Sequence, residues 1–326
     1  MALISVIVPI YNAGEYLLPC LESIAAQTHR QLEVLLVENA STDSSRRTCA
    51  DFCARDPRFR LLPQSQNLGA AGARALGAAQ AQGSCLAFVD GDDLLHPCFL
   101  EALVRALEGS GQPISCCRYA PFAADTLPSS GPVPEDWQIL AAPEHLRALL
   151  QDQRVDYSLC NKLYRAGALT PQDLQSDVAT NEDLLANWRC MRRAGGLAFV
   201  DLVGYHYRQH PASASHRPLC SGFLTNQLQV AQTILDQSAG TDLAPVAQAF
   251  YYEKLLYLYS MILRQSNADA FSGLRRQLLG SIRSQLTAAL RCPALSARMK
   301  GIALLSAFGG PVYAALCRRL LTDRQG

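Results

Sequence analysis

Three aspartates, Asp90, Asp92 and Asp93, lie within four residues and are interrupted only by Gly91. They follow residues 85–89, an apolar run that predicts a buried strand. Carboxylates gathered this closely repel one another unless a cation or hydrogen-bond donors offset their charge. Mg²⁺ typically binds through one or two carboxylates together with substrate phosphates. The cluster therefore predicts either a metal-assisted phosphate site built on Asp90 and Asp92, or a solvated turn before the next helix.

A single arginine, Arg74, lies in the Ala- and Gly-rich segment 69–82. An arginine in an apolar helix needs a partner, either a diphosphate or the carboxylates Asp90 and Asp92. The small residues around it predict close packing of a helix on a sheet or a phosphate cradle. Neither G-x-G-x-x-G nor a phosphate-loop G-K-[ST] occurs, which argues against both of those nucleotide-binding classes.

Polar or aromatic residues also follow the first two predicted strands. Tyr11 follows residues 4–10, where its ring either stacks on a base or packs in the core. Glu38 and Asn39 end the strand predicted at 32–37, where either accepts the imide N–H of uracil or shapes a helix-entry turn.

Two acidic residues, Glu182 and Asp183, open a predicted helix after the loop 169–180. The helix dipole stabilises a carboxylate there, so capping explains one of them. The functional alternative is a general base that deprotonates an acceptor hydroxyl.

The segment 205–210, Tyr-His-Tyr-Arg-Gln-His, follows another predicted strand. His206 or His210 is a candidate third metal ligand, and with Arg208 between them they are also candidates to hold phosphate. The alternative for each histidine is a structural role.

These residues must be positioned by a sheet whose strand ends meet. The first 110 residues alternate apolar strands and helices, which predicts a parallel, doubly wound sheet with ligands at the carboxyl ends of the strands. Further on we expect a strand at 114–119, a loop over the site at 121–137, a helix at 182–193, short strands at 197–201 and 203–207, and helices from about 221 onward.

The composition predicts a globular protein. Hydrophobic residues make up 49% and charged residues 17% of 326 residues, and the net charge of +1 predicts no recruitment of nucleic acid. Without a basic start or a long uncharged apolar run, we expect neither a secretion signal nor a membrane span, and hence a cytoplasmic protein. The 12 cysteines form no metal box, so we expect reduced, buried thiols.

Seven blocks occur in one order: SVIVPIYN at 5–12, VENASTD at 37–43, ARALG at 73–77, FVDGDD at 88–93, CNKLYR at 160–165, NED at 181–183 and YHYR at 205–208. Together they resemble the family 2 inverting glycosyltransferases of GT-A fold, in the branch that makes bacterial cell-surface polysaccharides. The resemblance implies a nucleotide-sugar-binding half at 1–110 and an acceptor and catalytic half at 111–218. The C-terminal helical region expected at 219–326 lies outside it.

The resemblance also implies a role for each matching residue. Pro9 and Tyr11 would flank uracil, Arg74 would contact the nucleotide, Asp90 and the adjoining Gly91 would lie at the ribose, and Asp92 would hold Mn²⁺ or Mg²⁺. Asp183 would be the base, supported by Glu182, in one inverting displacement. Lys162, Arg208 and His210 would lie in the phosphate or acceptor region.

Two positions depart from the family pattern. Asn39 stands where a carboxylate commonly meets the base, which weakens the expectation of uracil, and Ala75 replaces a usual asparagine. Neither change affects Asp92 or Asp183.

Residues 296–321 combine two apolar stretches with Arg298, Lys300, Arg318 and Arg319. Such helices either lie on an anionic membrane, at whose inner face a lipid-linked acceptor would be met, or pack on the domain or in a homodimer interface.

The sequence supports three functions. The first is transfer of a sugar from a nucleotide diphosphate donor, such as a UDP-sugar, to a hydroxyl of a glycan or lipid-linked acceptor. The second is nucleotidyl transfer, which usually uses a basic loop after the first strand that is lacking here. The third is a non-catalytic nucleotide-sugar-binding subunit, which would have no need of Asp183.

Overall fold

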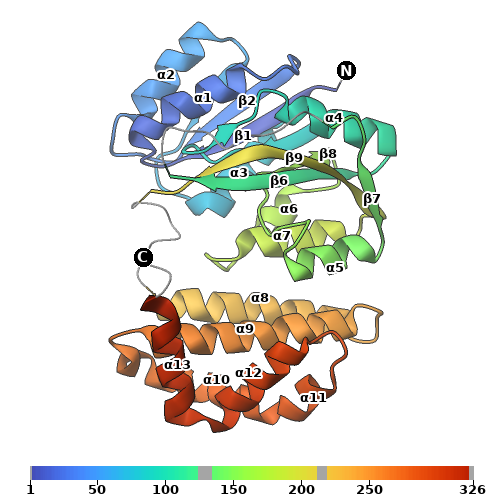
Figure 1. The fold of residues 1–326 in the computed structure, drawn as a ribbon. Coiled ribbons are helices and arrows are strands. Elements are labelled where there is room, and N and C mark those ends of the chain that lie inside the picture. The colour runs from blue at the N-terminus through green and yellow to red at the C-terminus, as the bar shows by residue number, and fades with distance from the viewer. Residues whose placement is uncertain (1, 124–133, 211–218, 323–326) are drawn as a thin grey trace. The chain divides into compact units, whose positions relative to one another are not determined.

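The computed structural model describes residues 2–123, 134–210 and 219–322. The chain divides into two compact units, 1–217 and 218–326 (Figure 1). Each unit is described by itself.

The first unit is built on a nine-stranded sheet with the order β3-β2-β1-β4-β8-β6-β9-β5, in which β7 also pairs with β9. The strands β1 (Ile4–Ile10), β2 (Leu32–Glu38), β3 (Phe59–Pro63) and β4 (Cys85–Phe88) are parallel. The side chains of β1, β2 and β4 are almost all buried, as their continuous apolar runs predict, whereas β3, at the edge of the sheet, is partly exposed. The sheet continues through β8 (Lys162–Arg165), β6 (Ile114–Phe122), β9 (Gly196–Arg208), β5 (Leu94–Leu95) and β7 (Gln138–Ala141).

Helices cover both faces of this sheet. On one side lie α1 (Leu17–Ala25) and α2 (Ser45–Arg55), and on the other α5 (Glu144–Gln151), α6 (Pro171–Leu174) and α7 (Glu182–Met191) (Figure 1). α3 (Gly69–Gln80) and α4 (Phe99–Ser110) complete the layers. A Cβ built at Gly77 would lie 2.4 Å from Ile7 Cγ2. The small residues of α3 therefore let it lie close to β1. The predicted α/β class is confirmed.

Several local expectations are corrected. Residues 197–201 and 203–207 form one strand, β9, whose pairing with β6 shifts register near Arg118. Residues 121 and 122 of the expected loop belong to β6, and residues 124–133 lie outside the described parts. After β1, Asn12 has a φ of 52°, and its Oδ1 accepts the Thr42 N–H at 2.8 Å.

The second unit is helical, as predicted. It consists of α8 (Ser221–Ser238), α9 (Ala244–Arg264), a short 3₁₀ turn (Ala268–Phe271), α10 (Ser272–Ser284), α11 (Leu286–Arg291), α12 (Ala297–Phe308) and α13 (Gly310–Thr322). α9 forms its centre, with Tyr252, Leu255, Leu258 and Ile262 fully buried. Among the helices described, none has the length and hydropathy that a bilayer crossing requires. All twelve cysteines lie in described segments and are unpaired.

Candidate functional site

The carboxyl ends of β1, β2 and β4 place Tyr11, Asn39 and Asp90 at the same edge of the sheet. β4 ends at Phe88, and the chain then turns so that the Asp93 N–H donates to the Asp90 carbonyl at 3.1 Å. The acidic cluster therefore lies where ligands of open α/β sheets bind.

Arg74 joins the two predicted acidic pairs. Its Nη2 donates to Asp90 Oδ1 at 2.8 Å and its Nη1 to Asp183 Oδ1 at 2.7 Å, while Glu182 Oε1 lies 3.6 Å from Nη1. The arginine is only 4% exposed, so these ion pairs are weakly screened by water. Residues 74, 90 and 183, which are far apart in the sequence, thus form one site.

Burial changes the protonation of this cluster. Burial and the neighbouring Asp183 raise the pKa of Glu182 to about 7, although Arg74 opposes the rise. Burial also raises the pKa of Asp183, against the guanidinium of Arg74. Both shifts make these carboxylates more basic than free ones, which is the direction that favours a general base.

A second support for Asp183 comes from the loop before β8. The Leu159 N–H donates to Asp183 Oδ2 at 3.2 Å. This loop is held by the fully buried Lys162, whose Nζ donates to the Ser158 carbonyl at 2.6 Å, the Asp156 carbonyl at 2.9 Å and Asn161 Oδ1 at 2.8 Å. The ammonium group is satisfied inside the protein, so the expected phosphate contact of Lys162 is replaced by a role in shaping the loop.

The same loop is tied to α7, the helix that carries the two acidic residues. Asn187 Nδ2 donates to the Tyr157 carbonyl at 2.9 Å and to the Ser158 carbonyl at 3.2 Å, and Asn187 Oδ1 accepts from Tyr164 Oη at 2.7 Å. The loop, β8 and the start of α7 are therefore fixed as one body around Asp183.

Replacing Lys162 with methionine is expected to destabilise the first unit by about 3–5 kcal/mol, because it leaves the Asp156 carboxylate without its cation and removes a donor from the Asp156 and Ser158 carbonyls and from Asn161 Oδ1. Both tryptophans of the chain, Trp137 and Trp188, lie in this unit, so urea unfolding followed by tryptophan fluorescence reports on it selectively. The same change at Lys300 in α12 is the control and should leave the transition in place. Equal midpoints for the two variants would contradict the assigned role of Lys162.

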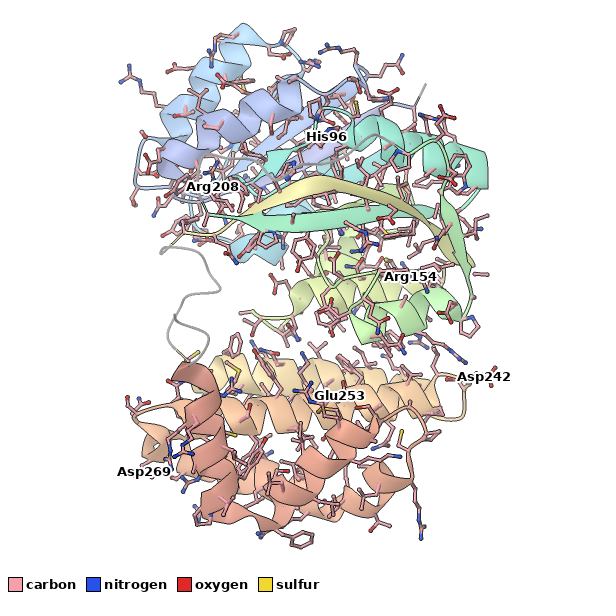
Figure 2. The ribbon with its side chains drawn as sticks, in the orientation of Figure 1. His96, Arg154, Arg208, Asp242, Glu253 and Asp269 are labelled. Carbon is pink, nitrogen blue, oxygen red and sulfur yellow. The ribbon has the colours of Figure 1, made fainter. Side chains whose placement is uncertain are left out.

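The end of β9 and the residues after it contact Asp92 and Asp93 of the acidic cluster. His210 Nε2 lies 3.0 Å from Asp92 Oδ2, and Arg208 Nε donates to the Asp92 carbonyl at 2.8 Å. The guanidinium of Arg208 lies 4.9 Å from the ring centre of Tyr16 and 4.6 Å from that of Phe122. Figure 2 shows Arg208 at the edge of the sheet where β9 ends. The structure therefore brings Arg208 and His210 to Asp92.

Asp93 helps to hold the turn in place, whereas Asp90 and Asp92 are the candidate ligand-binding residues. It is fully buried, accepts the Tyr205 hydroxyl and accepts the Arg208 N–H at 2.7 Å. Burial, Asp90 and Asp92 raise its pKa to about 8. Tyr205 Oη also accepts the Asp90 N–H at 3.2 Å, so this tyrosine fixes the turn that presents Asp90 and Asp92. The sequence pattern does not predict this role of Tyr205, and the only signal is its place at the start of the YHYR block.

His206 does not join this group. Neighbouring residues on a strand point to opposite faces, so His206 and Tyr205 lie on different faces of β9. It is 1% exposed, and its ring lies 6.4 Å from that of Phe122. Burial, together with His96, lowers its pKa. In the described segments His206 is not part of any group of three His, Cys, Asp or Glu side chains arranged to hold a metal, so the structure gives no support to the expected ligation by His206.

The donor set near Asp92 fits a hard divalent cation. Burial, followed by the charge of Asp90, raises the pKa of Asp92, which shows two carboxylates repelling one another in a poorly solvated place. A cation there would relieve that repulsion. In the described segments, no group of three or more His, Cys, Asp or Glu side chains is arranged to hold a metal. The carboxylates available match the one or two that Mg²⁺ uses alongside substrate phosphates.

At the place expected for the nucleobase, Tyr11 is 47% exposed, so its ring face is accessible. Asn39 is buried, donating to Asn67 Oδ1 at 2.8 Å and accepting the Leu68 N–H at 2.8 Å. Glu38 is also buried and accepts the Ser41 N–H at 2.6 Å. Both residues therefore shape the loops around the site, and Asn39 holds the entry to α3.

Sequence comparisons add to this geometry. The sequence model described as "Glycosyl transferase family 2" matches residues 5–170, about half of the chain. The chain is 42% identical to glycosyltransferase GlyG of Streptococcus pneumoniae over 32% of this chain and 35% of the relative. It is 29% identical to the uncharacterized glycosyltransferase EpsJ of Bacillus subtilis over 66% of this chain and 64% of the relative. It is 30% identical to the uncharacterized glycosyltransferase YibD of Escherichia coli over 65% of this chain and 63% of the relative. The matches thus span less than two thirds of these relatives' lengths.

Solved structures share the fold. The chain is similar to Staphylococcus aureus TarS 1-349 in complex with UDP-GlcNAc, with a TM-score of 0.66, 20% identity, and coverage of 99% of this chain and 92% of the other. It is also similar to the mannosyltransferase PcManGT of Pyrobaculum calidifontis in complex with GDP-Man and Mn²⁺, with a TM-score of 0.53, 16% identity, and coverage of 97% and 87%. The first of these likenesses extends over both units of the chain.

Proposed function

The chain belongs to glycosyl transferase family 2, and we propose that it moves a sugar from a nucleoside diphosphate donor to a hydroxyl of a glycan or lipid-linked acceptor. The main support for the proposal is that Arg74 donates both to Asp90 of the acidic cluster and to Asp183 at the start of α7. A donor site and a candidate base are thereby held at one place.

On the donor side, we assign the base to Pro9 and Tyr11, at the end of β1, and the ribose to Asp90 beside Gly91. Asp92, assisted by Asp90, would hold Mn²⁺ or Mg²⁺. When bound, that cation neutralises charge on the leaving diphosphate. Arg208 and His210, which contact Asp92, are placed to meet the same diphosphate. The UDP-GlcNAc and Mn²⁺ complexes of the structural neighbours support these assignments.

On the acceptor side, Asp183 takes the proton of the attacking hydroxyl. The acceptor oxygen forms a bond to the anomeric carbon as the bond from that carbon to the diphosphate oxygen breaks, so the configuration inverts. Glu182, whose pKa is raised to about 7, adjoins the base and supports it. Arg74 orients the Asp183 carboxylate and stabilises its negative charge in a buried environment.

The relatives' names support a role in glycan synthesis, and we place the reaction in the cytoplasm, at the inner face of the membrane when the acceptor is lipid-linked. The Asp183 arrangement favours an enzyme over a nucleotide-sugar-binding subunit, because a binder has no use for a positioned carboxylate beside its donor.

A thermal-shift panel of UDP-, GDP- and dTDP-sugars with Mn²⁺ tests the proposal and identifies the donor. The matching donor should raise the melting temperature of the first unit by about 5–10 °C at about 100 Kd, because ligand binding stabilises the native state by mass action. Tryptophan fluorescence again isolates this unit. A parallel series with chelator is the control. The proposal would be overturned if no nucleotide sugar shifted the transition at millimolar concentration.

A further inference from the structure

The end of the second unit has an unusual charge distribution. Residues 270–322 contain eight basic residues and no aspartate or glutamate. Asp269, labelled in Figure 2, is the last acidic residue before this stretch. Because the whole chain carries a net charge of only +1, the positive charge is concentrated locally. The unit therefore presents a local positive potential that attracts anionic partners.

Within this stretch, large apolar side chains are exposed at intervals of four residues. Leu304 is 44% exposed and Phe308 74% exposed, both on α12, while Val312 is 60% and Leu316 41% exposed on α13. Each pair lies on one face of its helix, because residues four apart are neighbours on a helix surface. Single exposed apolar residues are ordinary, but four of them within thirteen residues form a patch that indicates an interaction site.

The opposite faces of the same helices already have partners. Ala303 and Ala307 of α12 and Tyr313 and Cys317 of α13 are buried. The Tyr313 ring stacks on Tyr259 of α9 with ring centres 6.0 Å apart, and Arg283 of α10 donates to the Ala307 carbonyl at 2.9 Å. The helices are thus held by their inner faces. The four outer side chains contribute little to holding the unit together, so folding does not account for them.

Basic residues flank the apolar patch in the sequence. Arg298 and Lys300 precede it in α12, and Arg318 and Arg319 follow it in α13; all except the half-buried Lys300 are exposed. We call these four basic and four apolar residues the basic–apolar surface. Apolar side chains bordered by arginine and lysine match the boundary between lipid headgroups and acyl chains.

We propose that the basic–apolar surface binds the surface of an anionic lipid bilayer. A second copy of the chain is the weaker candidate, because a two-fold interface would bring the same positive charges against one another. A bilayer rich in anionic lipid instead supplies opposite charge over a wide area and an apolar layer for the four side chains. Such binding would bring the proposed transferase to lipid-linked acceptors, but it does not depend on catalysis by the first unit.

Flotation with vesicles tests the proposal. The protein should bind vesicles of 30% phosphatidylglycerol in phosphatidylcholine at least tenfold more tightly than vesicles of phosphatidylcholine alone. The preference should weaken with salt, since the charge interactions are screened. Absence of binding to the anionic vesicles would overturn the proposal.

Two variants separate the apolar and basic contributions. Combined Leu304→Ser, Phe308→Ser, Val312→Ser and Leu316→Ser should lower anionic vesicle affinity at least tenfold, and combined Arg298→Gln, Lys300→Gln and Arg318→Gln should remove the lipid preference. The matched control, Ile139→Ser with Tyr257→Ser, alters exposed apolar side chains elsewhere and should bind like the parent. Far-UV circular dichroism checks that the helices persist.

Two outcomes would contradict the assignment even if the parent binds vesicles. Unchanged vesicle binding by the serine variant would remove this surface as the contact. A parent that is a dimer by light scattering, and that the serine variant converts to a monomer, would assign the surface to self-association. Donor binding by the first unit is measured on the same samples, so failure of the membrane proposal is distinguishable from failure of the proposed catalytic function.

Discussion

Asp183→Asn is expected to reduce sugar transfer by about 10²- to 10⁴-fold, the range that a positioned general base contributes. The asparagine has nearly the same shape and can still accept the Leu159 N–H, but it cannot take the proton of the acceptor hydroxyl. Because Asp183 contacts Arg74 and is not itself assigned to the donor, affinity for the nucleotide should be nearly preserved. The measurement is product formation at saturating donor, with donor affinity determined separately.

The control for this substitution is Asp201→Asn, which removes an equally charged carboxylate that is 63% exposed and pairs with Arg118 away from the site. It should leave transfer within about twofold, since exposed ion pairs contribute little. Transfer by Asp183→Asn at the parental rate would eliminate this residue as the base. Glu182→Gln would then be the next variant to measure, because the pKa of Glu182 is about 7.

Asp92→Ala is expected to weaken UDP binding in Mn²⁺ at least about tenfold, equivalent to about 1.4 kcal/mol. The carboxylate is the assigned metal ligand, and its loss removes the anchor through which a cation would hold the diphosphate. The parent should lose a similar factor when chelator replaces Mn²⁺, whereas the variant should be almost insensitive to chelator. Calorimetric titration under both conditions measures the two effects.

The matched control is Asp51→Ala on α2, where the carboxylate is 68% exposed and pairs with Arg47. Its UDP affinity should equal that of the parent in both conditions. A parent that binds UDP equally well with Mn²⁺ and with chelator would contradict the metal role of Asp92, whatever the variant does.

Much of the fold was predictable because continuous apolar runs such as 4–10 and 85–89 can only be buried strands, and their ends fix Tyr11 and Asp90 at one edge. It was also predictable that Arg74 would pair with an anionic group, either a carboxylate or a diphosphate. That it bridges Asp90 to Asp183 was not predictable, because the bridge depends on how α3 and α7 lie against the sheet.

The errors have a common physical origin. Whether His206 joins two aspartates around a metal depends on tertiary contacts, and in the described segments no such group is formed. Lys162 was expected in the phosphate or acceptor region, yet its ammonium group donates to three oxygens inside the protein. Such compensation depends on tertiary contacts.

In the proposed mechanism, Asp90 and Asp92 bind the donor, Asp183 removes the proton, and Arg74 links the two groups. The most direct measurement is a side-by-side calorimetric titration of UDP, in Mn²⁺, into Asp92→Ala and Asp183→Asn. We predict that Asp92→Ala loses at least about tenfold in affinity while Asp183→Asn stays within about threefold of the parent. Equal losses in the two variants, or a loss confined to Asp183→Asn, would contradict the claim.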